Sequence, residues 1–187
     1  RYPEIDVELD ISNRRVDLLE EHVDVAIRIG SAEGLEDTSM VARKVYSQTL
    51  IFVTSPEALD LHGAPVRPAD LASRPLVRFV TGRVGRTHLL VGPGGERETF
   101  DQAGRLVVNS PLAARNALLA GEYFGLVADY LVTDALANGR LVRVLEGWST
   151  RPQPIFAVHA GRRLMPARVR VFLDFLAEAM GGAITGD

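Results

Sequence analysis

The feature that most constrains this fold is a repeated alternation between short apolar, strand-like runs and segments that open with helix-start signals. In one of them, Ser55-Pro56-Glu57 puts a capping hydroxyl before a proline at the first helical position, and Gly63 ends the predicted helix. Such alternation is typical of an α/β fold with a largely parallel sheet. The predicted strands are Ile5–Ile11, Val23–Ile29, Met40–Val45, Thr49–Val53, Leu76–Val80, Leu106–Val108, Phe124–Ala128, Leu141–Leu145 and Ile155–His159.

Helices are predicted between many of these strands. They are a short helix after Ser12-Asn13 that carries Val16, Leu19 and Val23, then Pro56–Gly63, Pro68–Ala72, Pro111–Ala120, a helix capped by Asp129 that runs to Ala137, and a last helix from Pro166. The last is the clearest, because its apolar residues from Val169 to Met180 recur at the helical period. The alternation breaks between Thr81 and Phe100, where two short runs flank Gly92-Pro93-Gly94-Gly95 and predict an antiparallel hairpin.

Composition narrows the class of protein. With 187 residues and 47% hydrophobic content, the chain can form one domain or two small lobes. The net charge is −3, and nothing in the sequence supplies the basic face with which a domain binds DNA phosphates. The absence of cysteine excludes disulfides and thiolate metal sites. No apolar run approaches the roughly 20 residues of a membrane span, so we expect no membrane contact and a cytoplasmic location. The four histidines lack ligand spacing, so we expect surface or edge positions and no metal site.

The start of the chain carries its own expectation. It opens with Arg1-Tyr2-Pro3-Glu4, has no initiator methionine and goes straight into a predicted strand. The residue before a proline is disfavoured in a helix, so Tyr2-Pro3 is typical of an exit from a preceding element. We therefore expect a fragment of a longer protein.

Several runs, taken in order, resemble the effector-binding domain of LysR-type transcription regulators. The resemblance lies in the opening Arg1–Leu9, in Arg15–Glu21 and Asp24–Gly30, in Val53–Leu59 with Gly63 and Pro68–Leu71, in Val108–Ser110, Ala120-Gly121, Gly125–Leu131 and Gly139–Leu145, and in Arg168–Leu176. Each run alone is weak evidence for the family. The ordered set extends from Arg1 to about Met180 and is specific.

The resemblance implies an α/β fold of two Rossmann-like lobes, as in type II periplasmic binding proteins. Lobe one would combine 1–47 with 154–187 and would be incomplete at its N-terminus, lacking a first strand and helix. Lobe two would be 48–153. A small-molecule effector would bind between the lobes and alter subunit geometry. DNA would be bound only by an N-terminal winged helix-turn-helix that this chain lacks. The domains would pair as a dimer, with Ile5–Ile11 against the Pro111–Ala120 helix of a partner, and form a tetramer in the full protein.

The position of the effector site also follows from general physics. In open α/β sheets, ligands bind beyond the carboxyl ends of parallel strands, where helix N-termini favour anions. We therefore expect a polar or anionic effector and no cofactor. The candidate effector-binding residues are Ser12, Asn13, Arg28, Ile29, Gly30, Thr81, Asn109, Ser110, Ala128 and Asp129.

Most of these residues have a simpler structural interpretation. Ser12, Asn13 and Ser110 suit helix caps, although a cap can also contact a ligand, and Asp129 fits a cap better than a ligand contact. Arg28 has two open interpretations: a surface ion pair with the acidic loop 33–37, or a clamp for a ligand carboxylate. Phe79 is a weaker candidate than Thr81, because it fits the core.

Three functions fit a chain of this kind to different degrees. A sensing domain of a transcription regulator agrees with every run above. A free solute-binding protein of a transport system shares the fold but needs export, and no signal peptide is visible. An enzyme is not expected, because Ser110 lacks both a nucleophile-elbow motif and an assigned base.

Overall fold

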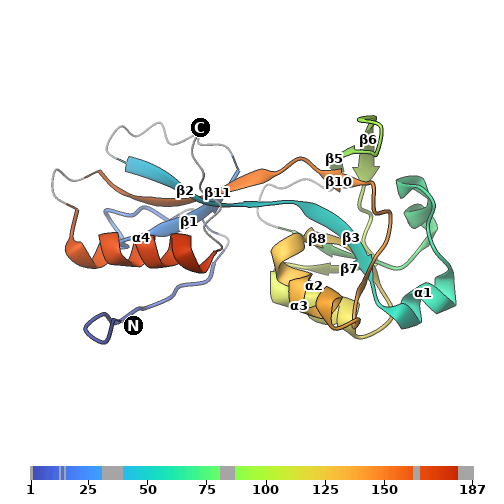
Figure 1. Ribbon diagram of the computed structural model, residues 1–187, viewed down its shortest axis with the longest axis horizontal. Helices are drawn as coiled ribbons and strands as arrows, with labels where there is room; N and C mark the ends of the chain where they lie inside the picture. Colours follow the sequence, from blue (N-terminus) through green and yellow to red (C-terminus); the bar gives the residue numbers. More distant parts are fainter. Residues whose placement is uncertain are drawn as a thin grey trace. The chain divides into compact units, whose positions relative to one another are not determined.

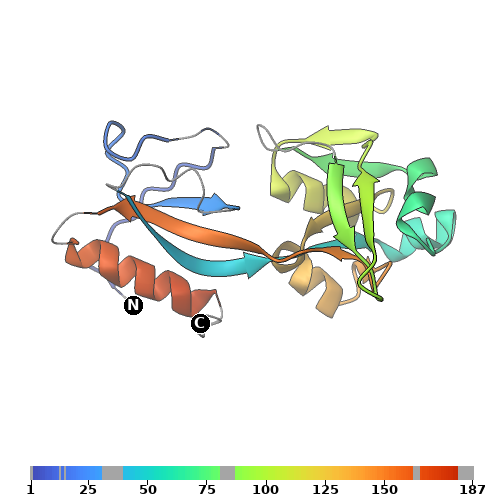
Figure 2. The ribbon, with the colours of Figure 1, turned by 90° about the horizontal axis from the view of Figure 1, so that it is seen from above.

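The computed structural model describes residues 2–12, 14, 16–30, 40–80, 87–161 and 165–180. The chain forms two compact units, which are distinguishable in Figures 1 and 2. Unit 1 comprises Arg1–Ser47 and Gln153–Asp187, and unit 2 comprises Gln48–Pro152. None of the helices in the described part of the chain is long and apolar enough to cross a membrane.

Unit 1 is built on a three-stranded sheet covered by one helix. The strand order is β1 (Ala26–Ile29), β11 (Gln153–Ala160) and β2 (Met40–Gln48). Strands β1 and β11 are antiparallel, with Ala26 opposite Val158. Helix α4 (Ala167–Ala179) runs along the sheet in both views (Figures 1 and 2) and buries Val169 and Leu173 against the apolar side chains of β2 and β11.

The predicted strand Ile5–Ile11 is wrong. Residues 5–11 have no regular secondary structure, and Val7, Leu9 and Ile11 are 63%, 75% and 82% exposed. An alternating run becomes a strand only when another strand supplies its hydrogen bonds, and none of the described strands pairs with this segment. The alternation is therefore compatible with a strand, but no strand among the described residues pairs with residues 5–11.

The predicted helix after Ser12 shortens to turns. Residues 18–22 form consecutive turns, closed by hydrogen bonds from Glu21 N–H to Asp17 O and from Val23 N–H to Leu18 O. The Asp17 carboxylate accepts the backbone N–H of Leu19 at 2.9 Å, an Asx-type bond that competes with helix formation. Only Leu18 is buried here, at 4% exposure, so little packing energy favours a longer helix.

Unit 2 contains an eight-stranded sheet. Its order is β6 (Arg97–Asp101), β5 (Thr87–Val91), β10 (Ser149–Thr150), β3 (Leu50–Thr54), β8 (Phe124–Ala128), β4 (Leu76–Phe79) and β7 (Leu106–Val108), with β9 (Val142–Arg143) paired to β3 off this path. The helical segments are α1 (Pro56–His62), the 3₁₀ helix η1 (Pro68–Ser73), α2 (Pro111–Leu119) and α3 (Asp129–Ala137).

Each face of this sheet buries its own apolar cluster. Helices α2 and α3 cover one face (Figure 1), where Leu118 and Val132 meet Val53 and Val127 of the central strands. The other face packs α1, η1 and the β5–β6 hairpin around Phe52 and other buried side chains. Strands buried on both faces carry nearly continuous apolar sequences, which is why β3 and β8 were recognisable.

The sheet is mixed, and the prediction of a largely parallel sheet is wrong. Among the strand pairs whose direction the described residues give, β4 with β7 and β4 with β8 are parallel, and the others are antiparallel. Strand–helix alternation favours parallel pairing. Strand β3, through which the chain enters unit 2, is nevertheless antiparallel to β8. The hairpin β5–β6 is confirmed as antiparallel.

Candidate functional site

Three parallel strands bring four of the candidate residues to one edge of the unit 2 sheet. Val77 on β4 pairs with Leu106 on β7 and with Gly125 on β8, so the carboxyl ends of all three strands lie together. Helix α2 begins directly after β7, and α3 begins directly after β8. We call this region the strand-end edge. It consists of Asn109, Ser110, Ala128 and Asp129, together with Thr49, whose carbonyl oxygen accepts the backbone N–H of Asp129.

The α2 side of the strand-end edge is a capped helix start. Ser110 precedes Pro111 and accepts the backbone N–H of Ala113 on its hydroxyl oxygen, at a long 3.4 Å. The capping role predicted for Ser110 is confirmed. Asn109 is exposed and Ser110 is half-buried, and the first turn of α2 carries no acidic side chain. This end of α2 is therefore electrostatically open to an anionic group.

The α3 side differs from the prediction. The N-cap residue is Ala128, which has no side-chain cap, and Asp129 is the first residue of the helix. The predicted cap at Asp129 is therefore wrong by one position. Its carboxylate accepts the N–H of Tyr130 at 2.8 Å and lies at the positive end of the helix dipole. An acidic side chain already occupies this helix end, so the two ends offer different chemistry.

Arg115 holds the two helices in place. From α2 it donates through Nε to the carbonyl of Leu131 at 3.0 Å and through Nη2 to Oδ2 of Asp134 at 2.6 Å, both on α3. The hydrogen bond and the charge of Arg115 hold the pKa of Asp134 below its ordinary value, and Arg140 adds to this. The pair is separated by 19 positions, and nothing in the sequence pointed to it.

The unit 1 candidates lie at the end of β1 and in the segment before it. Arg28 donates through Nη2 to the carbonyl of Val16 at 3.2 Å, a contact with the backbone that neither interpretation of Arg28 included. Gly30 has a φ of 116° and donates its N–H to Pro154 O at 3.0 Å. Ile29 is 54% exposed, and Ser12 is exposed in a segment without regular structure. Asn13, Thr81 and the loop 33–37 lie outside the described residues.

The histidines are not all at the surface. His22 and His62 are exposed, but His88 is half-buried on a strand flanked on both sides, and His159 on β11 is only 4% exposed. The expectation of surface or edge positions is therefore wrong for His88 and His159, because each side chain falls on an inward-facing position of its strand. Among the described residues, no group of three or more histidine or acidic side chains is placed to hold a metal ion.

Comparison with known proteins gives a consistent result over the whole chain. Residues 1–181 match the family model of the LysR substrate binding domain. The chain is 31% identical over 179 residues to an HTH-type transcriptional regulator of Xanthomonas campestris pv. campestris, covering 94% of this chain and 51% of that protein. It is 30% identical over 187 residues to the HTH-type transcriptional regulator CrgA of Neisseria meningitidis serogroup C, covering 100% of this chain and 61% of that protein.

A solved structure agrees with the sequence matches. The regulatory domain of AphB in Vibrio vulnificus aligns with a TM-score of 0.77 at 30% identity, covering 95% of this chain and 86% of that one. This chain therefore corresponds to a regulatory domain, and it spans only 51% and 61% of the length of the two curated relatives.

Proposed function

Because the chain belongs to the family of LysR substrate-binding domains, which have the type II periplasmic-binding-protein fold and are regulatory rather than catalytic, we propose that it senses a small polar effector through the strand-end edge of unit 2. The observation that supports this most is the parallel register of β4 with both β7 and β8, which places two helix starts beside three strand ends. Ligands of α/β sheets bind at such edges.

The chemistry of the two helix starts suggests what kind of effector fits. The start of α2 lacks an acidic side chain and favours an anionic group, such as a carboxylate. At the start of α3, the carboxylate of Asp129 accepts hydrogen bonds and favours a donor. We therefore propose an effector that carries both an acidic group and a hydroxyl or amino donor.

The remaining candidates are part of the same proposal. The family resemblance implies an effector held between lobe one (1–47 plus 154–187) and lobe two (48–153). The proposed contacts of that effector are Ser12, Asn13, Arg28, Ile29, Gly30 and Thr81. Arg28 has five guanidinium N–H donors, and within the described residues one of them donates to the carbonyl oxygen of Val16. The proposed role of the remaining donors is to bind a ligand carboxylate. An effector changes subunit geometry only if it binds one arrangement of the lobes more tightly than the other.

The curated relatives are named as HTH-type transcriptional regulators. We propose that the complete protein regulates transcription, with DNA bound by an N-terminal domain outside this chain. A regulator of transcription acts on the chromosome, so the proposed location is the cytoplasm. The proposed assembly is a dimer of these domains and a tetramer of the complete protein.

The test is a thermal-shift screen of hydroxy acids, amino acids and aromatic acids. A ligand at a concentration 100 times its Kd stabilises the folded state by roughly 2.7 kcal/mol, which raises the melting temperature measurably. Asp129→Asn should reduce the shift for a ligand with a donor group. The matched control is Asp60→Asn, because Asp60 is exposed on α1, away from the edge. If no acid raises the melting temperature, or if both variants respond equally, the proposed edge is wrong.

A further inference from the structure

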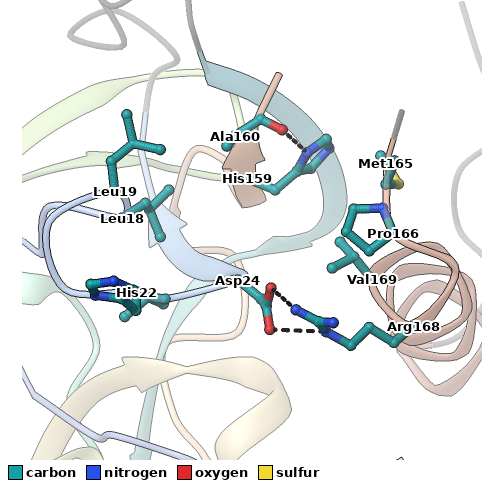
Figure 3. Close-up of a pocket in the computed structure, with 11 residues that line it drawn as sticks. Leu18, Leu19, His22, Asp24, His159, Ala160, Met165, Pro166, Arg168 and Val169 are labelled. Atoms are coloured by element: carbon teal, nitrogen blue, oxygen red, sulfur yellow. Dashed lines mark hydrogen bonds and ion pairs between the residues drawn. The ribbon is translucent and has the colours of Figure 1, made fainter. Parts of the chain in front are cut away.

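Unit 1 contains a hollow of about 260 Å³ that includes none of the candidate effector residues. Figure 3 shows Leu18 and Leu19 on one side of it and Met165, Pro166 and Val169 on the other. The hollow lies where β11 ends, at Ala160, whereas Ile29 and Gly30 lie at the opposite end of the same strand pair, because Ile29 pairs with Ile155. It is therefore separate from the strand ends on which the proposed function rests.

Apolar side chains form one part of the wall, and the polar side chains of His22, Asp24, His159 and Arg168 form another. Leu18 and Val169 are 4% and 5% exposed, and Met165 packs against the same cluster as α4. Leu19 also lines the hollow and is 49% exposed. The apolar part of this lining favours the body of an apolar ligand. The volume is below the roughly 300–1,000 Å³ of pockets for drug-sized ligands, so the occupant is small, of the size of a single ring.

Among the described residues that line the hollow, His159 is the one with a buried polar side chain. Its Nδ1 lies 3.1 Å from the carbonyl oxygen of Ala160. A carbonyl only accepts, so Nδ1 carries the proton in the neutral ring and Nε2 presents a lone pair. Within the described residues, Nε2 has no hydrogen-bond partner. A ligand hydroxyl would donate to this nitrogen.

The charges at the rim do not attract an anion. Arg168 on α4 donates through Nη2 and Nε to the two carboxylate oxygens of Asp24, at 3.0 and 3.4 Å (Figure 3). The guanidinium is therefore already neutralised by its partner. A carboxylate placed in the hollow would meet the lone pair of His159 and the nearby Asp24, and both contacts are unfavourable.

We propose that this hollow is a second ligand site that takes a small aromatic alcohol of the phenol class. The ring packs against Leu18, Met165 and Val169, and the hydroxyl donates to Nε2 of His159. The proposal does not depend on the proposed effector site, because the two share no residue.

The experiment uses the 187-residue chain with ¹³C-methyl methionine and follows the methyl resonances by NMR during a phenol titration. The chain has three methionines, and Met165 alone lines the hollow. Met180 lies at the other end of α4 and serves as an internal reference. We expect a saturable shift at Met165 and none at Met180. Anisole keeps the ring and the oxygen but has no donor, and it should bind about fivefold more weakly, the value of one net hydrogen bond.

Two variants test the position without touching the core. Leu19→Trp enlarges a half-exposed side chain of the lining and should abolish the Met165 shift. Leu61→Trp is the control, because Leu61 is 73% exposed on α1 in unit 2, and it should leave the shift intact. Equal shifts in the two variants would overturn the site. Benzoate or anisole binding as tightly as phenol would overturn the ligand class.

Discussion

The backbone N–H of Asp129 donates to the carbonyl oxygen of Thr49 across 2.9 Å, which joins the first residue of α3 to the second residue of unit 2. The bond continues the pairing of β3 with β8, in which Leu50 lies opposite Ala128. The point where the chain enters unit 2 is therefore part of the strand-end edge. A ligand that contacts α3 at its start contacts an element fixed to that entry point.

The two serine caps of unit 2 should differ in their contribution to stability. Ser55 is 1% exposed and accepts Ala58 N–H at 3.1 Å, whereas Ser110 is half-buried and accepts Ala113 N–H at 3.4 Å. Replacing a cap by alanine costs about 0.5–2 kcal/mol, and we expect Ser55→Ala near the upper end and Ser110→Ala near the lower. Urea unfolding of both variants measures this, and a larger loss at Ser110 would contradict it.

Gly125 is required by a close approach between β8 and α2. A Cβ at this position would lie 3.1 Å from side-chain carbons of both Leu118 and Val77. We expect Gly125→Ala to lower the free energy of unfolding by about 1–3 kcal/mol through overpacking. The double variant with Leu118→Ala should lose less than the sum of the two single variants, because the smaller side chain makes room. Additive losses would show that the contact is not the cause.

Protonation of His88 should destabilise the chain in mild acid. Burial lowers the pKa of His88 from its ordinary value of 6.5, and a hydrogen bond with Gln102 partly offsets this. Below pH 6.5 the unfolded chain binds a proton that the folded chain resists, so the free energy of unfolding falls as the pH falls towards the lowered pKa. Urea titrations between about pH 5 and 8 should show this fall in the wild type and a smaller one in His88→Gln. The same slope in both would exclude His88 as the cause.

The proposed dimer can be tested at an exposed leucine. Leu9 lies in the segment proposed to meet α2 of a partner and is 75% exposed, so a charge there costs the isolated chain little. We expect Leu9→Glu to weaken the dimer in light scattering, because it places a charge in an apolar interface. Leu61→Glu is the control, at 73% exposure on α1. A dimer that survives Leu9→Glu would show that the interface lies elsewhere.

The elements predicted best from sequence are those with a local cause. Helix α1 follows from Ser55, Pro56 and Gly63, and α4 follows from its apolar period, because each signal lies within the element that it specifies. The segment 5–11 has an equally clear alternation and no strand. Its structure depends on a neighbour in space, which a periodic pattern cannot supply.

The candidate site was predictable only in part. Strand ends followed by helix starts identified Ser110 and Asp129, but strand direction could not be derived from alternation alone. The bond of Arg28 to Val16 O left no trace in the sequence, because a backbone carbonyl is present at every position. The hollow beside His159 was missed for a similar reason: its walls come from segments more than 130 residues apart, joined by the Asp24–Arg168 pair whose separation is 144.

The position of β4 between β7 and β8 has a mechanical consequence. Hydrogen bonds join it on one side to the strand that leads into α2 and on the other to the strand that leads into α3, so neither helix start can slide along the sheet without breaking a ladder. Close-packed elements of this kind shift as a block and do not flex one by one. We therefore predict that a ligand bound at the strand-end edge displaces β4, β7, β8 and the starts of α2 and α3 together.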